Sequence, residues 1–197
     1  MIGPDILRAL APVVAVLEHL GVPYRLGGSL VTLAHGLPRA TVDADVVAEL
    51  RDEHAAVLVA ALGQDFYLDE GAVREAIRRR SSFNAIHLAT MIKVDLFVPP
   101  DAQFDRSEQA RARPHSFEVE GGLRTFVVES PEDHVLRKRR WYRDGNEVAA
   151  QQWRDVVGVL QVQAGNLDDR YLDEWAERLG VADLLAEARR EAAGDPT

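Results

Sequence analysis

Two aspartates stand at alternate positions inside a segment that otherwise has the sequence of a strand. Residues 41–47 alternate in character, so Asp43 and Asp45 share one face of the predicted strand. Two carboxylates this close repel each other unless a cation lies between them. An Asp-x-Asp pair alone is common on protein surfaces, but its place inside a strand favours a cation site.

A third acid lies in a later strand. Residues 83–88 and 91–98 are predicted to form two strands, which end at a pair of prolines. Along the second of these, the even-numbered positions are apolar, whereas Lys93 and Asp95 share the opposite face. A carboxylate in the middle of an apolar strand is costly unless it is paired or bound to a metal. Three such carboxylates suit a hard cation such as magnesium, with water and phosphates as the remaining ligands.

A glycine turn could bind the phosphates that such a cation site would need beside it. Residues 24–26 are predicted to form a short strand, followed by Gly27-Gly28-Ser29 and a helix over residues 30–35. Because glycines carry no side chain, phosphates can approach their backbone amides at the positive end of the helix. Gly-Gly-Ser alone is a common loop, so the signal lies in its combination with the acidic strand.

The remaining elements define the fold class. Residues 4–20 have the apolar spacing of an amphipathic helix, and further helices are predicted over residues 52–62 and 70–80. Strands over residues 117–119 and 124–128 flank two glycines and predict a hairpin.

Ser130, followed by a proline and two acidic residues, has the pattern of a helix start. From there only helices are predicted, over residues 131–143, 146–164, 168–179 and 181–193. We therefore predict an α+β fold, with a mixed sheet flanked by helices over residues 1–129 and a helical bundle over residues 130–197. No low-complexity linker separates the two, so the bundle is expected to pack on the core.

The ordered set of these residues resembles the nucleotidyltransferase superfamily, which includes DNA polymerase beta, tRNA CCA-adding enzymes and bacterial AbiEii-type toxins. The match covers about residues 20–100 and consists of Gly27-Gly28-Ser29, Gly36, Arg39, Thr41, Asp43-Ala44-Asp45 and Asp95 within Lys93-Val94-Asp95-Leu96-Phe97. The resemblance implies a minimal nucleotidyltransferase fold and the transfer of a nucleoside monophosphate from a nucleoside triphosphate to a hydroxyl, with release of pyrophosphate.

The resemblance also implies a role for each aspartate. Asp43 and Asp45 would hold two ions of Mg²⁺ or Mn²⁺, and Asp95 would hold the ion that acidifies the attacking hydroxyl. Gly28 and Ser29 would bind the leaving phosphates.

A weaker resemblance lies in the helical region. Ser130-Pro131-Glu132-Asp133 leading to Lys138, then Trp153-Arg154-Asp155, is similar to AbiEii-type and related small bacterial nucleotidyltransferases. It implies that Lys138, and with it Arg39, offsets phosphate charge and that Asp155 belongs to the nucleotide site. An equally weighted alternative for Asp155 is a helix-surface pair with Lys138 or Arg154.

The implied partners follow from the same resemblance. The acceptor would be RNA such as tRNA, a protein or a small molecule. The AbiEii-type resemblance also implies a toxin-like role, and such a toxin would have an antitoxin partner. Residues 30–32 lack the arginine and aspartate that CCA-adding enzymes place after their glycines, which argues against a tRNA-tail polymerase.

Composition limits the compartment and the partners. The chain has no cysteine, which excludes disulfides and thiolate metal sites, and no apolar run approaches the ~20 residues of a membrane span. Its first residues lack a secretory pattern, so we expect a cytoplasmic protein without a membrane partner. The net charge of -9 argues against a general nucleic-acid coat protein.

Three local basic clusters nevertheless leave a polyanionic partner open, at residues 78–80, 106–113 and 137–143. The six histidines show no zinc spacing and are interpreted as surface or core residues. Trp153 and Trp175 are expected in the core, whereas Trp141 lies among cations that favour stacking on a base.

Two hypotheses of different classes remain. The first is an active nucleotidyltransferase. The second is a catalytically inactive protein of the same fold with a binding or regulatory role, which the acidic net charge and the small core favour.

Overall fold

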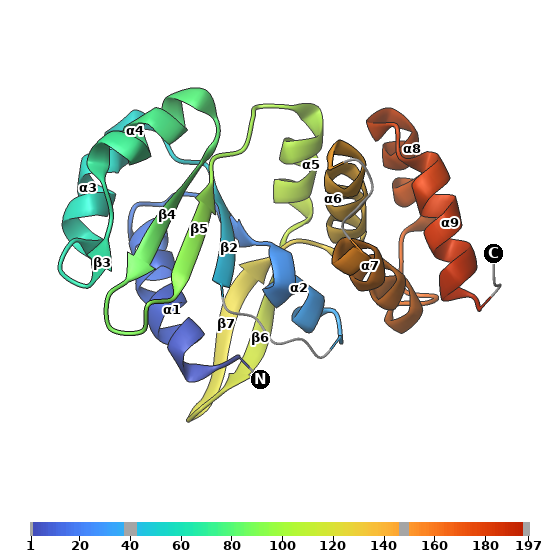
Figure 1. Cartoon of the computed structure of the whole chain (residues 1–197), viewed down its shortest axis with the longest axis horizontal. Helices are drawn as coiled ribbons and strands as arrows, with labels where there is room; N and C mark the ends of the chain where they lie inside the picture. Colours follow the sequence, from blue (N-terminus) through green and yellow to red (C-terminus); the bar gives the residue numbers. More distant parts are fainter. Residues whose placement is uncertain (1, 38–42, 146–149, 195–197) are drawn as a thin grey trace. The chain divides into compact units, whose positions relative to one another are not determined.

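A computed structural model of the chain describes residues 2–37, 43–145 and 150–194. These residues separate into two compact units, the first of residues 2–30 and 43–128 and the second of residues 31–37, 129–145 and 150–194. The first unit carries a sheet of seven strands, and the described part of the second is helical. An α+β fold with a mixed sheet and a C-terminal group of helices is thus confirmed (Figure 1).

The sheet has the strand order β3-β4-β5-β2-β1-β7-β6. Its strands are β1 (Tyr24–Leu26), β2 (Asp43–Ala48), β3 (Phe66–Tyr67), β4 (Ser82–His87), β5 (Lys93–Phe97), β6 (Arg113–Val119) and β7 (Gly122–Val128). β2 pairs with β5 in parallel, as β1 does with β7, and the other neighbouring pairs are antiparallel. The sheet is therefore mixed, with β2 and β5 in its interior.

The helices of the first unit are α1 (Pro4–His19), α3 (Asp52–Leu62), α4 (Glu70–Arg79) and α5 (Gln103–Arg111), together with the start of α2 (Gly28–Ala34). α1 packs against β2 and β5, and its apolar stripe is buried there. The face of β2 and β5 that carries Ala44, Val46 and Val94 is fully buried. This apolar face forms the core and leaves the other face of both strands for polar side chains.

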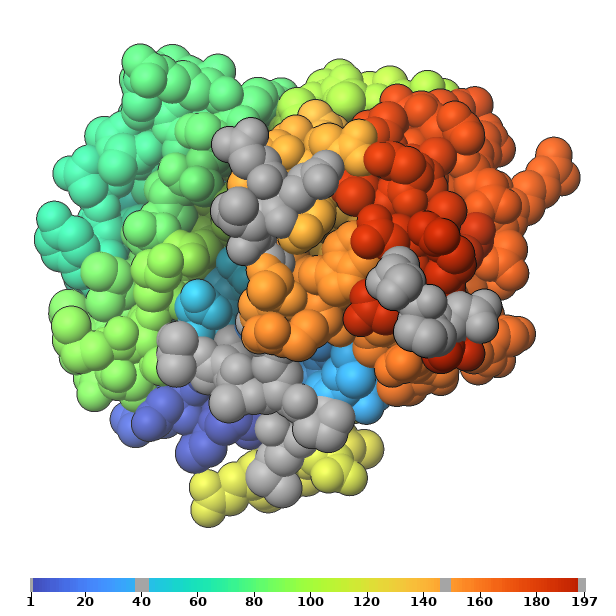
Figure 2. All heavy atoms as spheres, turned by 45° about the vertical axis from the view of Figure 1, so that its right-hand side comes forward, coloured from blue at the N-terminus to red at the C-terminus, as the bar shows by residue number. Residues whose placement is uncertain are grey.

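The hairpin of β6 and β7 forms one edge of the sheet. The backbone N–H of Ile2 donates to the carbonyl oxygen of Glu118 at 3.1 Å, which ties the start of the chain to β6. In Figures 1 and 2 the hairpin, drawn in yellow, extends to the lower edge of the first unit beyond α1. β6 contains Pro114. An edge strand tolerates proline, because one side of the strand pairs with no neighbouring strand and needs no backbone N–H there.

The second unit is built from α6 (Pro131–Asp144), α7 (Ala150–Val162), α8 (Asp169–Leu179) and α9 (Ala182–Ala192). α6 packs on α7 and α8, and α9 packs on α7 and α8. The predicted start of α6 is confirmed, because the Ser130 hydroxyl accepts from the N–H of Asp133 at 3.1 Å and Pro131 occupies the first turn. The second unit also includes the residues around His35, which were predicted as part of the core.

Several predicted boundaries were wrong. α2 begins at Gly28 rather than after the glycine turn, and β5 begins at Lys93 rather than at Met91, whose φ of 57° places it in a turn. β6 begins four residues before the predicted position, at Arg113. β3 and α5 were not predicted. The first residues of the strand predicted over 41–47 and of the helix predicted over 146–164 lie outside the described residues.

Candidate functional site

The three aspartates of the predicted metal site lie on two neighbouring strands. In the parallel pair of β2 and β5, Asp45 stands directly opposite Asp95, and Asp43 stands opposite Lys93. Residues opposite each other in a sheet, or two apart along a strand, point to the same face. The sheet therefore brings Asp43, Asp45 and Asp95 together on one face, opposite the apolar core. Asp43 and Asp45 are half-buried, and Asp95 is 9% exposed.

Gly28 packs directly against this carboxylate group. Its φ is +60°, and a Cβ built on it would lie 1.7 Å from Oδ2 of Asp45. The N–H of the preceding Gly27 donates to the carbonyl oxygen of Asp45 at 3.0 Å. Both glycines thus hold the start of α2 against Asp45, and only a residue without a side chain fits at position 28. Ser29, the next predicted phosphate ligand, is 9% exposed.

Lys93 lies on the same face as the three aspartates. Its ammonium Nζ lies 2.7 Å from Oδ2 of Asp95, and the Lys93 side chain is 43% exposed. The hydrogen bond to Asp95 raises the pKa of Lys93 against the opposing effect of burial, and the charges of Asp95, Asp43 and Asp45 raise it further. The ammonium is therefore within the field of all three carboxylates. Sequence reasoning identified the residue as a neighbour of Asp95 but assigned it no role.

The donor set of this face suits a hard divalent cation, because it consists of carboxylate oxygens. Within residues 2–37, 43–145 and 150–194, no three acidic or histidine side chains are arranged as a ready set of metal ligands. The Lys93 ammonium lies 2.7 Å from Oδ2 of Asp95. The residues thus fit the chemistry of the ion, with Lys93 as an additional cation beside them.

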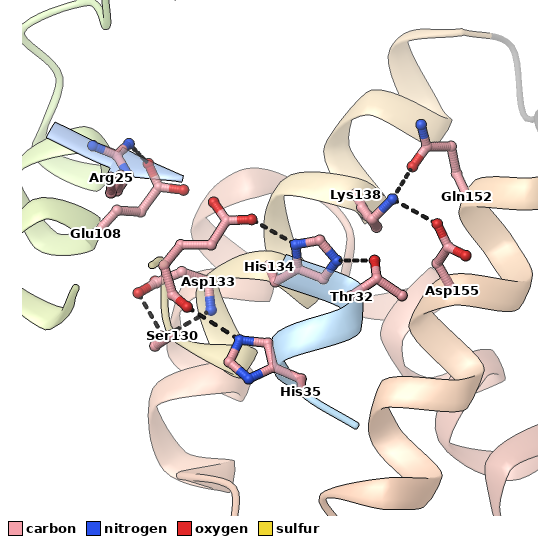
Figure 3. Close-up of polar contacts among 11 residues, drawn as sticks. Arg25, Thr32, His35, Glu108, Ser130, Asp133, His134, Lys138, Gln152 and Asp155 are labelled. Atoms are coloured by element: carbon pink, nitrogen blue, oxygen red, sulfur yellow. Dashed lines mark hydrogen bonds and ion pairs between the residues drawn. The ribbon is translucent and has the colours of Figure 1, made fainter. Parts of the chain in front are cut away.

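A buried ion pair supports the same face of the sheet. Arg25 stands opposite Val47 in the pairing of β1 with β2, so it shares the face of Asp45. Its guanidinium lies 2.8 Å from a carboxylate oxygen of Glu108 on α5, and both side chains are fully buried (Figure 3). Sequence reasoning missed this pair. The signal available was Arg25 itself, because a charged residue in a short apolar strand needs a buried partner.

The described residues also line a hollow of about 520 Å³ at the other end of β2. Glu49, Arg51, Asp101 and Arg106 contribute to its wall. Glu49 follows Asp45 by four residues, about 13 Å along an extended chain. The hollow is therefore separate from the carboxylate face.

In the second unit, the structure pairs Lys138 with Asp155. The Lys138 ammonium donates to Oδ2 of Asp155 at 2.8 Å and to Oε1 of Gln152 at 2.7 Å, as Figure 3 shows. Both charged side chains are at most 5% exposed. The alternative of a helix-surface pair is thus right in its partner, Lys138, and wrong in its location, because the pair is buried. The predicted nucleotide-binding roles of both residues stay predictions, and Arg39 lies outside the described residues.

A second buried network joins α2 to α6. His134 Nδ1 donates to Oε1 of Glu129 at 2.5 Å, and its Nε2 lies 2.9 Å from the Thr32 hydroxyl (Figure 3). His35 donates through Nε2 to the carbonyl oxygen of Glu129 at 3.1 Å. Burial lowers the pKa of His134, against the raising effect of Glu129. A neutral imidazole thus connects the two helices, which places His134 and His35 among the core residues.

The predicted locations of the tryptophans are confirmed for Trp175 and only partly for Trp153. Trp175 is 8% exposed and belongs to the core, and Trp141 is 38% exposed with the Arg137 guanidinium 6.0 Å from its ring centre. Trp153 is only half-buried, and its indole N–H donates to Glu191 at 2.6 Å.

Comparisons with known proteins identify the fold. No protein-family model matches the sequence, and no curated protein matches it. An antigenic nucleotidyltransferase-like protein from Paracoccidioides brasiliensis is similar in structure, with a TM-score of 0.53 and 18% identity over 96% of this chain and 94% of that chain. The antibiotic-resistance factor ANT(2'')-Ia is similar with a TM-score of 0.54 and 13% identity, over 94% of this chain and 96% of that chain.

None of the helices in the described parts of the chain is long and apolar enough to cross a membrane. Both structural neighbours match nearly the full length of the chain, at identities that define a fold and not an activity. The chain has the nucleotidyltransferase fold.

Proposed function

We propose that the protein is a metal-dependent nucleotidyltransferase that moves a nucleoside monophosphate from a nucleoside triphosphate to a hydroxyl group. The observation that carries this proposal is the group of Asp43, Asp45 and Asp95 on one sheet face, with Asp45 packed against Gly28. In the reaction, the hydroxyl oxygen forms a bond to the α-phosphorus and gives up its proton to solvent. The bond between the α-phosphorus and the bridging oxygen breaks, and pyrophosphate leaves.

Asp43, Asp45 and Asp95 would hold Mg²⁺ or Mn²⁺ on this face. Such ions lower the pKa of a bound hydroxyl and neutralise charge on the phosphates. The three aspartates lie on paired strands rather than on loops, so the positions of their carboxylates relative to one another would be well defined. Gly28 lets the start of α2 pack against the Asp45 carboxylate, and Ser29 follows it at the start of α2. We propose that these two residues bind the leaving phosphates.

Lys138, Asp155 and Arg39 are proposed as further nucleotide ligands from the resemblance of the helical region alone. Lys138 already shares its charge with Asp155 and Gln152. In the proposed site, Asp155 would therefore orient Lys138, which would contribute the cation.

The acceptor is proposed to be a hydroxyl of RNA such as tRNA, of a protein or of a small molecule. A structural neighbour is an antibiotic-resistance factor, which supports testing small molecules first. The AbiEii-type resemblance supports a toxin with an antitoxin partner, and the exposed Trp141 with Arg137 offers a stacking surface for a base. We further expect a cytoplasmic protein.

A second candidate function is a catalytically inactive protein that binds nucleotides or another protein. The observation that favours it is the ion pair of Lys93 with Asp95, because the proposed metal site needs Asp95 as a ligand. Calorimetry with each nucleoside triphosphate, with and without Mg²⁺, separates the two, because a scaffold without a metal site gives no metal-dependent heat.

Transfer is tested by incubating the protein with α-phosphate-labelled nucleoside triphosphates, Mg²⁺ and a cell extract. We expect label to enter RNA, protein or small molecules with the wild-type protein and not with Asp43→Ala. Asp5→Asn is the matched control, because Asp5 is an exposed acid on α1. Label that enters the acceptor equally with Asp43→Ala would refute the proposal.

A further inference from the structure

The Lys93 ammonium lies 2.7 Å from Oδ2 of Asp95 on the carboxylate face. Its register position places it opposite Asp43, and it lies two residues before Asp95 on β5. Positions two apart on a strand share a face, so the ammonium and all three carboxylates lie on the same side of the sheet.

The charges of this face require a cation. Asp43, Asp45 and Asp95 are three acidic side chains at adjacent positions of two paired strands, where like charges destabilise a sheet. The Lys93 ammonium offsets one of them. All three aspartates attract this ammonium, so its effect is shared by the whole group rather than confined to Asp95.

A divalent ion and the ammonium would compete for the same carboxylate group. Oδ2 of Asp95 already accepts from Lys93 at 2.7 Å, so an ion that took Asp95 as a ligand would have the ammonium beside it. Two cations on one carboxylate repel each other strongly at such distances. The Lys93 side chain is 43% exposed, so it can swing into solvent without disturbing the apolar core.

We propose that Lys93 is a built-in counter-cation that neutralises the carboxylate group and gives up its place on Asp95 when a divalent ion binds. Lys93 thereby sets the affinity of the site for the ion. This inference rests on the proposed function for the location of the metal site. It makes Lys93 a positioning residue that acts through Asp95.

The test measures Mn²⁺ binding by calorimetry, without nucleotide, for the wild-type protein, Lys93→Met and Lys93→Arg. Lys93→Met removes the charge and keeps an unbranched side chain, and we expect it to bind Mn²⁺ about tenfold more tightly. Lys93→Arg keeps the charge and should bind like the wild type. Equal or weaker binding by Lys93→Met would overturn the proposal.

A second readout needs no metal. In EDTA, Lys93→Met should unfold at a lower temperature than the wild type, and adding Asp95→Asn to that variant should raise its unfolding temperature. In the wild-type background, Asp95→Asn should not raise it. An equal effect of Asp95→Asn in both backgrounds would count against the counter-cation role.

The outcomes separate this inference from the proposed function. Mn²⁺ binding by Lys93→Met with none by the wild type supports the inference, and no binding by any variant overturns it. The transfer assay with Asp43→Ala is judged independently. Transfer that depends on Asp43, together with unchanged affinity in Lys93→Met, would leave the proposed function intact and refute the role of Lys93.

Discussion

At the scale of single residues, Gly28 meets two demands at once. Its φ of +60° strains any L side chain, and the position of its missing Cβ is taken by the Asp45 carboxylate. Gly21 has nearly the same φ, +64°, but nothing lies within 4 Å of its Cβ position. The two glycines therefore separate the cost of backbone strain from the cost of crowding the carboxylate.

We expect Gly21→Ala to cost about 1–2 kcal/mol of unfolding free energy from backbone strain alone. Gly28→Ala should cost about 1–3 kcal/mol more, because Asp45 has to move. Urea unfolding of both variants measures the difference, and the transfer assay should show lost activity for Gly28→Ala only. Equal losses of stability and activity in the two variants would show that the contact with Asp45 is unimportant.

At the scale of elements, the buried ion pair of Arg25 and Glu108 fastens α5 to β1. Both side chains are fully buried, so removal of one leaves an uncompensated charge or an unpaired polar group in the interior. Solvent-exposed ion pairs contribute much less to stability. Arg78 and Glu75 on α4 are 61% and 43% exposed, and solvent screens their attraction.

Arg25→Met should therefore destabilise the protein by about 3–5 kcal/mol, whereas Arg78→Ala should cost no more than about 1 kcal/mol. Chemical denaturation of each variant checks these values. If Arg25→Met were as mild as Arg78→Ala, the pair would have no structural role. A double variant, Arg25→Met with Glu108→Leu, should recover part of the loss, since it leaves no buried charge of the pair.

The link between α2 and α6 should respond to pH. Burial holds the pKa of His134 below its usual 6.5, so the unfolded chain takes up a proton at this residue at a higher pH than the folded protein does. Below about pH 6.5 the unfolded state then binds more protons, and stability falls as the pH falls by up to about 1.4 kcal/mol per unit.

His134→Gln removes this titration and keeps a polar side chain between Thr32 and Glu129. We expect the wild-type protein to lose stability relative to this variant between pH 7 and pH 5, measured by urea unfolding across that range. Parallel stability curves for the two proteins would contradict the neutral state of His134.

Elements with a strong local signal could be predicted, and elements fixed by tertiary contacts could not. α1 and α6 carry an apolar stripe or an N-cap serine with proline, which are local features. β3 has two residues and exists only by pairing with β4. α5 has a polar surface and was interpreted as a basic cluster, because its anchor, Glu108, depends on Arg25 more than 80 residues away.

The candidate site could also be predicted only in part. Alternation along the strands placed Asp43, Asp45 and Asp95 on polar faces, but only the parallel register of β2 and β5 puts Asp95 opposite Asp45. The ion pairs Lys93–Asp95 and Lys138–Asp155 follow from side-chain geometry that sequence spacing does not contain.

Among the described residues, the chain consists of a sheet unit and a helical unit, each with its own cluster of polar side chains. The sheet unit contains the three carboxylates, Gly28 and Lys93. The helical unit contains the Lys138–Asp155 pair and the His134 network. The carboxylates of the proposed metal site thus lie in the sheet unit, and the Lys138 ammonium lies in the helical unit.

The most direct test of the central claim is the rate of nucleotide transfer by Asp45→Asn in Mg²⁺, compared with the wild type and Asp5→Asn. Asparagine keeps the shape of the side chain beside Gly28 and removes the charge opposite Asp95. We expect a loss of at least about 10²–10³-fold in rate for Asp45→Asn and none for Asp5→Asn. Transfer at the wild-type rate by Asp45→Asn would show that the carboxylates do not hold a catalytic metal ion.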